Sequence, residues 1–453
     1  MVTAVLMVLA VASLMASKGV VAGAWQAGSR LQALSAQVLV TGGMLSATSI
    51  ISSRAFVQLA TISLFIAAVS IGDVASLKKS TRKFLCAPRG SRLPLRNTNF
   101  PTLSVLALWL WLFTVNLWMV INEDASEALF RLVSGITLLV FLLTQRSNPI
   151  RPNHFYSAVL TSVCLVCLVL PIWPSSFISC SVFKCTAFGA ILQGPFASGN
   201  TLGLSAAMCA ALLFSTMKIT RREAVVLLLL LIIMYATMSR TSFFAFGATV
   251  VLVAMDRFIA TGRLKASSFD VVAKLTALCV ALMPMLMSMY FVFTSEPSAF
   301  SNRGRIWRLA REAVGDDFLT GVGIDRWDLL KDQGYFGRQF DLFTHSEYLL
   351  LYFSGGMIAL VVFAAILYKI TLIAIVGRQS LARGAVVPLT FAVCGVIESL
   401  WNPLTIDSGT WLFFAVASVA FSVDFVPTKD VASGLNTASQ IGRYRGPRAL
   451  YSR

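Results

Sequence analysis

The chain has 453 residues, of which 57% are hydrophobic and only 13% are charged, and its mean hydropathy is +0.78. Soluble globular domains do not reach this apolarity, so composition excludes that class and indicates helices surrounded by lipid. The net charge is +17, but the basic residues are scattered among short loops. A nucleic-acid partner would need them gathered on one folded surface, so we expect none.

Apolar runs follow one another along the chain, and runs of about 17–25 apolar residues are typical of membrane-spanning helices. The candidate spans are 1–17, 31–52, 55–72, 101–121, 127–144, 155–171, 198–216, 224–238, 242–255, 270–293, 346–369, 384–400 and 410–425. Arg54 and the polar residues of 31–52 indicate that one of the first three lies in the membrane interface. We therefore expect about twelve spans in a single membrane domain over 1–425, followed by a basic, disordered tail over 426–453.

Basic loops set the expected orientation. The 78–96 loop carries seven lysines and arginines and no acidic residue, which predicts a cytoplasmic position. Alternating from there, the later basic loops also fall inside. The outside segments are then 122–126, 172–197, 239–241, 294–345 and 401–409. Cys180 and Cys185 lie in one of them, where either a disulfide or a pair of free thiols is consistent with the sequence.

One of the two histidines lies where the long 294–345 loop re-enters the membrane. Thr344 and Glu347 have the spacing of a capping box, which predicts that a helix starts at His345. In a first helical turn the imidazole stays neutral, because the helix dipole disfavours its protonated form, and a neutral imidazole can act as a general base. Gly356, nearly on the same face, would allow a neighbouring helix or lipid to approach. For His345, the alternative is a position at an interface without a catalytic role. For Glu347, the alternative to a helix cap is a catalytic acid.

Arg240 lies between two apolar runs of about fifteen residues each. Fifteen helical residues reach only about 22 Å, which is short of the roughly 30 Å hydrocarbon thickness. We therefore expect Arg240 below the outer surface in a protein-lined cavity, where an arginine needs an anionic partner. The alternative is an arginine that extends to the lipid headgroups.

Arginines also cluster at 303–311 in the long loop. If this segment is helical, Arg305 and Arg308 share a face with Glu312, so some of these charges can pair with each other. A guanidinium suits phosphate because its planar fork donates two parallel hydrogen bonds. Two arginines from separate loops could therefore hold a diphosphate without a metal.

Patterns for a metal or a cofactor are weak. Asp316 and Asp317 have no third ligand at a suitable spacing, and the eight cysteines show no metal-ligand spacing. Gly321-Val322-Gly323 follows no predicted strand, so it indicates a tight turn rather than a nucleotide loop. We expect neither a metal nor a cofactor.

Together these residues resemble the O-antigen ligase and O-antigen polymerase superfamily of bacterial membrane glycosyltransferases. The matching segments are Gly194-Pro195-Phe196 through Gly199-Asn200-Thr201-Leu202-Gly203, Ser239-Arg240-Thr241, Arg303-Gly304-Arg305-Ile306-Trp307, Gly321-Val322-Gly323, and His345-Ser346-Glu347-Tyr348-Leu349 with Gly355-Gly356. The ligase patterns of Arg, three residues, Leu and of His, ten residues, Gly fit Arg305/Leu309 and His345/Gly356. The resemblance covers about residues 190–360.

The resemblance implies an all-α, polytopic, GT-C-like membrane protein that transfers a glycan from undecaprenyl diphosphate at the periplasmic face of the bacterial inner membrane. It implies inverting, metal-independent chemistry, in which Arg240 and Arg305 hold the diphosphate, Arg303 assists, and His345 is the base.

The acceptor stays open among the lipid A core (ligase), another lipid-linked repeat (polymerase) and a protein (O-oligosaccharyltransferase), and we favour the ligase. A transporter of lipid-linked glycans is the alternative from another class. It would place charges along a path through the bilayer, whereas the apolar runs here carry almost none.

Overall fold

The structure is a computed structural model that describes residues 2–16, 30–46, 62, 100–123, 125–147, 150–180, 184–196, 198–216, 219–261, 266–336, 344–404 and 409–422. Nearly all of the candidate span 55–72 and the whole of the predicted 426–453 tail lie outside these residues, so both stay predictions. A helix lies at each of the other candidate spans.

The described part of the chain is helical apart from one small sheet, as the composition predicts. Its elements are α1 (Val2–Ala16), α3 (Arg30–Ser46), α5 (Phe100–Glu123), α6 (Ala125–Ser147), α7 (Pro152–Val169), η1 (Pro174–Ser176), β1 (Phe177–Ser179), β2 (Ala190–Leu192), α8 (Gly199–Thr216), α9 (Arg221–Ala236), α10 (Arg240–Thr261), α11 (Ala266–Thr294), α12 (Ala299–Val314), α13 (Asp325–Asp332), α14 (Glu347–Arg378), α15 (Leu381–Cys394) and α16 (Thr410–Phe421). Five of the described helices, namely α7, α8, most of α10, most of α11 and α14, are long and apolar enough to cross a membrane. Several others are shorter and apolar. The total of about twelve spans and the GT-C-like arrangement stay predictions.

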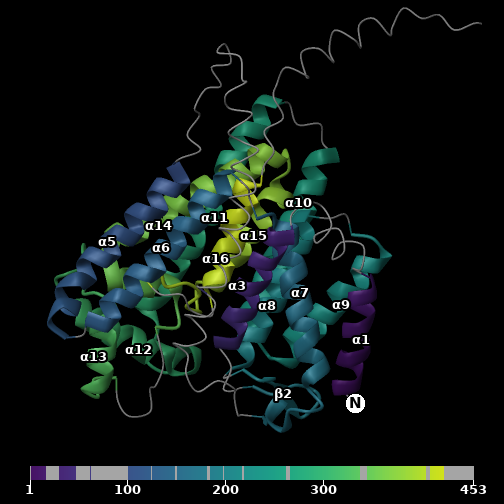
Figure 1. Cartoon of the computed structure of the whole chain (residues 1–453), viewed down its shortest axis with the longest axis horizontal. Helices are drawn as coiled ribbons and strands as arrows, with labels where there is room; N and C mark the ends of the chain where they lie inside the picture. Colours follow the sequence, from purple (N-terminus) through teal and green to yellow (C-terminus); the bar gives the residue numbers. More distant parts are fainter. Residues whose placement is uncertain are drawn as a thin grey trace, which may run out of the picture.

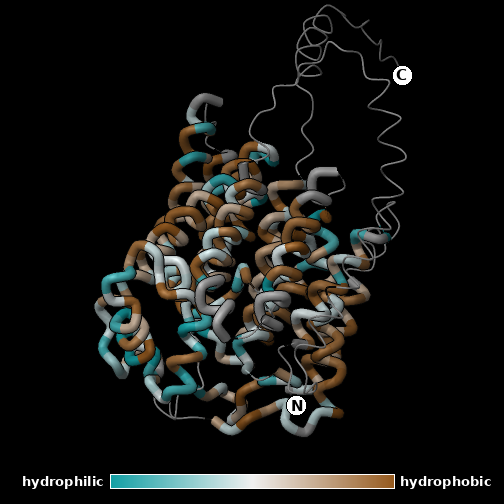
Figure 2. Tube along the Cα trace, turned by 60° about the vertical axis from the view of Figure 1, so that its left-hand side comes forward, coloured by the Kyte–Doolittle hydropathy of each residue, from teal (hydrophilic) through white to brown (hydrophobic). Residues whose placement is uncertain are grey.

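The long helix α14 organises the bundle, because it packs against α5, α11, α15 and α16. Figure 1 shows it running among these helices, while α7, α8 and α9 form a second group beside them. Hydrophobic residues dominate the helices, and hydrophilic residues concentrate at their ends and in the lower part of the molecule (Figure 2). This distribution is the one that a lipid-embedded bundle requires.

Helix α14 is broken at Gly356, whose backbone takes φ 65° and ψ −161°. The 318–322 segment fills the break: Met357 N–H donates to Phe318 O at 2.9 Å, and Val322 N–H donates to Phe353 O at 2.8 Å. A Cβ on Gly356 would lie 2.2 Å from Leu319 O, so only glycine allows this approach. The close approach predicted at Gly356 is therefore present, but the neighbour is a loop of the same chain rather than a helix or lipid.

The described residues of the 172–197 and 294–345 segments lie at one end of the bundle, which we call the loop end (Figure 1). Strands β1 and β2 pair antiparallel there, with Phe177 opposite Leu192. The longer segment contains α12 and α13 rather than being a plain polar loop. Helix α13 is anchored on the bundle, because Asp325 forms an ion pair with the buried Arg131 of α6 and Ile324 N–H donates to Asn116 Oδ1 of α5 at 2.6 Å.

The basic loops predict that the loop end faces outward. A cysteine introduced at Asp316, which is exposed beyond α12, should react with an impermeant thiol reagent in intact spheroplasts. A cysteine at Arg222, exposed at the opposite end of the bundle, should react only after permeabilisation. Both variants are made in a chain whose native cysteines are serine, and the reverse labelling pattern would contradict the orientation.

Candidate functional site

The Glu398 carboxylate contacts residues from three other segments of the loop end. It lies between α15 and α16, and its side chain is 16% exposed. Its Oε1 accepts hydrogen bonds from Asn200 Nδ2 at the start of α8, at 2.8 Å, and from Arg303 Nη2 of α12, at 3.1 Å. Its Oε2 lies 3.9 Å from His345 Nδ1. We use the name Glu398 cluster for five residues: Lys184, Asn200, Arg303, His345 and Glu398. Lys184 belongs to it through its contact with Asn200.

The backbone at His345 differs from the prediction. His345 has φ 49°, in the left-handed region, and lies before the helix rather than in its first turn. Helix α14 is capped by Ser346, whose side chain accepts from Leu349 N–H at 3.2 Å. Thr344 lies two residues before this cap, and its hydroxyl pairs with the Ser399 hydroxyl at 2.6 Å. The predicted capping box is therefore wrong, and with it the argument from the first turn of the helix.

Glu347 has a positioning role that neither alternative from the sequence included. Its buried carboxylate accepts from the backbone N–H groups of Leu400 at 2.8 Å and of Trp401 at 2.9 Å. In return, the Glu347 N–H donates to Gly395 O and Glu398 O, at 2.9 and 3.0 Å. These bonds hold the segment that carries Glu398 against the segment that carries His345.

The His345 ring is 21% exposed. Its Nδ1 faces Glu398, while its Nε2 is buried and has no hydrogen-bond partner among the described residues. A carboxylate beside Nδ1 favours the tautomer with its proton there, which leaves the Nε2 lone pair able to accept a proton. A buried nitrogen without a partner costs free energy unless a ligand supplies one.

The Glu398 carboxyl is kept ionised by its neighbours. Burial by itself would raise its pKa, but the facing His345 imidazole and the charge and hydrogen bond of Arg303 together hold the pKa below its ordinary value. The cluster therefore has a fixed negative charge, which orients the cationic Arg303 and the proton-accepting His345.

Helix α12 divides the arginines of the 303–311 segment between two faces. Ile306, Trp307 and Ala310 are buried, and Trp307 Nε1–H donates to Thr344 O at 3.0 Å, which ties α12 to the His345 segment. Arg303 turns inward, where its guanidinium also donates to Ile397 O. Arg305 and Arg308 are on the exposed face, and Arg308 lies 3.7 Å from Glu312, as the helical spacing predicts. The structure thus brings Arg303, rather than Arg305, into the Glu398 cluster.

Arg240 begins α10 and is exposed. Helix α10 has 22 residues, which corresponds to a length of roughly 33 Å. The expectation of a short helix is therefore wrong for α10, and the position of Arg240 below the outer surface of the membrane stays a prediction. Arg240 still belongs to the same region, because its charge and that of Arg303 reach Lys184, which lies beside Asn200 with Nζ 3.4 Å from Oδ1.

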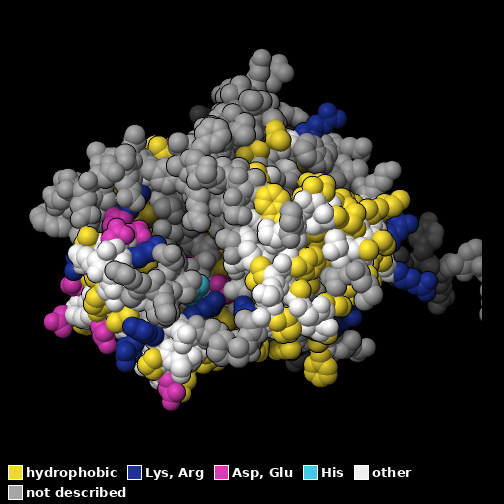
Figure 3. Space-filling model, turned by 90° about the horizontal axis from the view of Figure 1, so that it is seen from below, with side chains coloured by type: hydrophobic (Ala, Val, Ile, Leu, Met, Phe, Trp, Pro, Cys, Tyr) yellow, Lys and Arg dark blue, Asp and Glu magenta, His cyan; other side chains and the backbone are white. Residues whose placement is uncertain are grey.

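Basic side chains surround the candidate site. Figure 3 looks onto the loop end and shows lysine and arginine side chains beside a histidine and an acidic side chain near the middle of this face.

The acidic residues with metal-binding potential lie elsewhere. Asp316 and Asp317 are exposed, and Asp325 is paired with Arg131. The described residues contain no group of three or more His, Cys, Asp or Glu side chains placed to hold a metal ion.

Asn200 and Glu398 have no assigned role in the sequence analysis. Glu398 falls inside the candidate span 384–400, whereas α15 ends at Cys394. The usable signal is an acidic residue within an apolar run, which is costly in lipid and therefore marks a functional position. Asn200 is part of the family resemblance, but no sequence pattern pairs it with a carboxylate 198 positions away.

Residues 225–364 match the family described as O-antigen ligase. The match runs from α9 to the middle of α14 and includes Arg240, Arg303, Arg305 and His345. It confirms the resemblance to the O-antigen ligase and polymerase superfamily. Neither a curated protein nor a solved structure matches the chain.

Because the folded-state pKa of Glu398 is depressed, its stabilising effect is present above the pKa of the unfolded chain and is lost as pH falls through the folded-state pKa. Glu398→Gln should therefore lower stability near neutral pH by about 1–3 kcal/mol, the range for hydrogen bonds to charged groups. This difference should shrink in acid. Thermal unfolding of the detergent-solubilised protein over a pH series measures it, and Glu312→Gln, in an exposed ion pair, is the control. A difference that is independent of pH would contradict the ionised Glu398.

Proposed function

We propose, from the O-antigen ligase domain at residues 225–364, that this protein is a glycosyltransferase of the O-antigen ligase type. It transfers a glycan from undecaprenyl diphosphate to an acceptor hydroxyl of the lipid A core at the periplasmic face of the bacterial inner membrane. The observation that carries the proposal is the Glu398 cluster, in which one carboxylate orients a histidine with a buried, unpartnered Nε2 beside a group of cations.

His345 acts as the general base in this proposal. The acceptor hydroxyl binds at Nε2, which supplies the hydrogen-bond partner that this nitrogen lacks among the described residues. As the hydroxyl oxygen attacks the anomeric carbon, its proton moves to Nε2. Glu398 then stabilises the imidazolium across the 3.9 Å separation from Nδ1. Attack opposite the leaving group inverts the anomeric centre.

The arginines stabilise the leaving group. The bond between the anomeric carbon and the diphosphate breaks with its electron pair on the phosphate oxygen, so negative charge grows on the lipid diphosphate. Guanidinium groups placed beforehand offset that charge without a metal. Arg303 and Arg240 lie in the same electrostatic neighbourhood, and Arg305 lies on the adjoining exposed face of α12.

The location of the charges favours transfer over transport. His345, Glu398, Arg303, Lys184 and Arg240 all belong to the loop end, where the ends of several helices meet. A transporter would need charged sites at successive depths through the bilayer. A polymerase would share this chemistry and differ only in the acceptor, so the products of the assay distinguish it from a ligase.

Replacing the base should abolish most of the activity. His345→Ala should reduce the rate of transfer by about 10²–10⁴, the usual contribution of a positioned acid–base group. Purified protein, lipid-linked donor and lipid A-core acceptor are mixed in detergent with and without EDTA, and the wild-type rate should not depend on the chelator. Inhibition by EDTA that magnesium or manganese reverses would instead implicate carboxylates such as Asp316, Asp317 or Asp325.

Two arginines on the same face of α12 provide a matched pair. Arg305→Lys keeps the charge but loses the two-pronged geometry, so we expect turnover to fall about tenfold or more at an unchanged protein level. Arg308→Lys is the control, because Arg308 pairs with Glu312 on the helix surface. If Arg305→Lys kept the same turnover as Arg308→Lys and the wild-type protein, Arg305 would not bind phosphate.

A further inference from the structure

Lys184 extends the Glu398 cluster towards the hairpin of β1 and β2. Its Nζ lies 3.4 Å from Asn200 Oδ1, and Asn200 Nδ2 donates to Glu398 Oε1 at 2.8 Å. A continuous polar chain therefore runs from the lysine through the amide to the carboxylate and on to Arg303 and His345. Neither the sequence patterns nor the O-antigen ligase match at 225–364 includes this lysine.

The electrostatic setting of Lys184 suits an additional anion. The lysine is half-buried, and it feels one carboxylate, Glu398, but two guanidiniums, Arg303 and Arg240. Burial first, and then these two cations, lower its pKa against the opposing effect of Glu398. A bound diphosphate would relieve the repulsion among the three cations.

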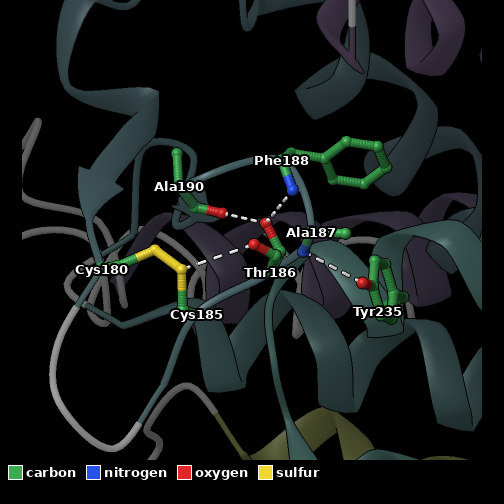
Figure 4. The surroundings of a disulfide bond; sticks show 7 residues. All are labelled: Cys180, Cys185, Thr186, Ala187, Phe188, Ala190 and Tyr235. Carbon is green, nitrogen blue, oxygen red and sulfur yellow. Dashed lines mark hydrogen bonds between the residues drawn. A yellow bond between two sulfur atoms is a disulfide. The ribbon is translucent and has the colours of Figure 1, made fainter.

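A disulfide fixes the backbone at this lysine. Cys185, the next residue, is bonded to Cys180, so of the two alternatives left open by the sequence the structure shows the disulfide. Beyond it, Phe188 N–H donates to Thr186 Oγ1 at 3.1 Å, and Ala187 N–H donates to Tyr235 Oη of α9 at 3.0 Å (Figure 4). The hairpin tip is thus tied both to itself and to the helix that leads to Arg240.

We propose that Lys184 is a further cationic ligand, beside the arginines, for the diphosphate of the lipid-linked donor, and that the Cys180–Cys185 disulfide holds this lysine in the site. The inference rests on the proposed transfer function and adds a substrate-binding residue to it. The disulfide matters because a lysine has a flexible four-carbon side chain. A mobile backbone would add its own ordering cost to each binding event. A crosslink adjacent to the lysine removes that part of the cost before the donor arrives.

The test measures the Kd of undecaprenyl diphosphate for the full-length protein in detergent. Lys184→Met, which keeps most of the side-chain length and removes the charge, should weaken binding about tenfold, as expected for a lost charge-assisted hydrogen bond. Lys184→Arg should restore most of the affinity. Lys331→Met replaces another lysine of the loop end, which is exposed on α13, and should have no effect.

The role of the disulfide is tested by a double-mutant cycle. Cys180→Ser/Cys185→Ser should weaken binding in the wild-type background but should add little in the Lys184→Met background. Cys279→Ser, at an exposed free cysteine of α11, is the control. If the double-serine variant does not fold, Tyr235→Phe replaces it, because this change removes the acceptor for Ala187 N–H and loosens the same turn.

The outcomes separate the inference from the proposed function. Wild-type protein that transfers glycan while Lys184→Met keeps the wild-type Kd would overturn the inference alone. Fully additive losses in the cycle would overturn the role of the disulfide in placing Lys184. Wild-type protein that binds the lipid diphosphate in a Lys184-dependent way but transfers nothing would contradict the proposed function and leave the binding site in place.

Discussion

A largely buried carboxylate must be compensated, and at Glu398 that requirement holds the loop end together. A carboxylate with 16% of its side chain exposed is stable in its ionised form only when donors and cations replace water around it. Here they come from α8, from α12 and from the segment before α14. Because these segments are remote in sequence, their common dependence on one charge fixes the positions of Arg303 and His345 relative to each other. The positions of the residues proposed to act on the substrate therefore follow from the compensation of Glu398.

The backbone conformation of His345 places its imidazole beside the Glu398 carboxylate. A residue in a regular first turn would have its ring direction set by the helix, whereas the left-handed φ of 49° turns His345 away from the α14 axis before the helix begins. Such a conformation is costly for a non-glycine residue and persists only when its surroundings enforce it. The enforcing contacts are visible: Ser346 caps the helix, Thr344 binds Ser399, and Glu347 holds the backbone of the 395–401 segment. The polar contacts of these three residues, which flank His345 in the chain, thus oppose relaxation of the His345 backbone.

The family match and the structural cluster overlap only in part. The match at 225–364 contains His345 and the arginines, while Glu398, Asn200 and Lys184 lie outside it. In the proposed mechanism, the base and the arginines of the matched region therefore act together with residues from the segments on either side. Lys184, next to the disulfide in the β1–β2 hairpin, and Glu398, between α15 and α16, lie on opposite sides of the matched region in sequence and are connected through Asn200. In this proposal, substrate binding and the orientation of the base are linked through shared hydrogen bonds rather than through neighbouring positions in the chain.

The sequence by itself determined the all-α class and the positions of most helices, and it gave His345, Arg240, Arg303 and Arg305 as the candidate site residues. These features depend on local apolarity and on residue types, which composition and spacing report directly. Only the tertiary structure decided that Glu398 is the partner of His345, that Arg303 faces inward while Arg305 faces outward, and that Ser346 rather than Thr344 caps α14. The capping pattern failed because the helix begins at Glu347, so that Ser346 takes the cap position, while the Glu347 carboxylate accepts from the backbone of Leu400 and Trp401, more than fifty residues away. A local pattern describes the groups that could pair, but in a folded chain the partner is chosen among all groups that packing brings within reach.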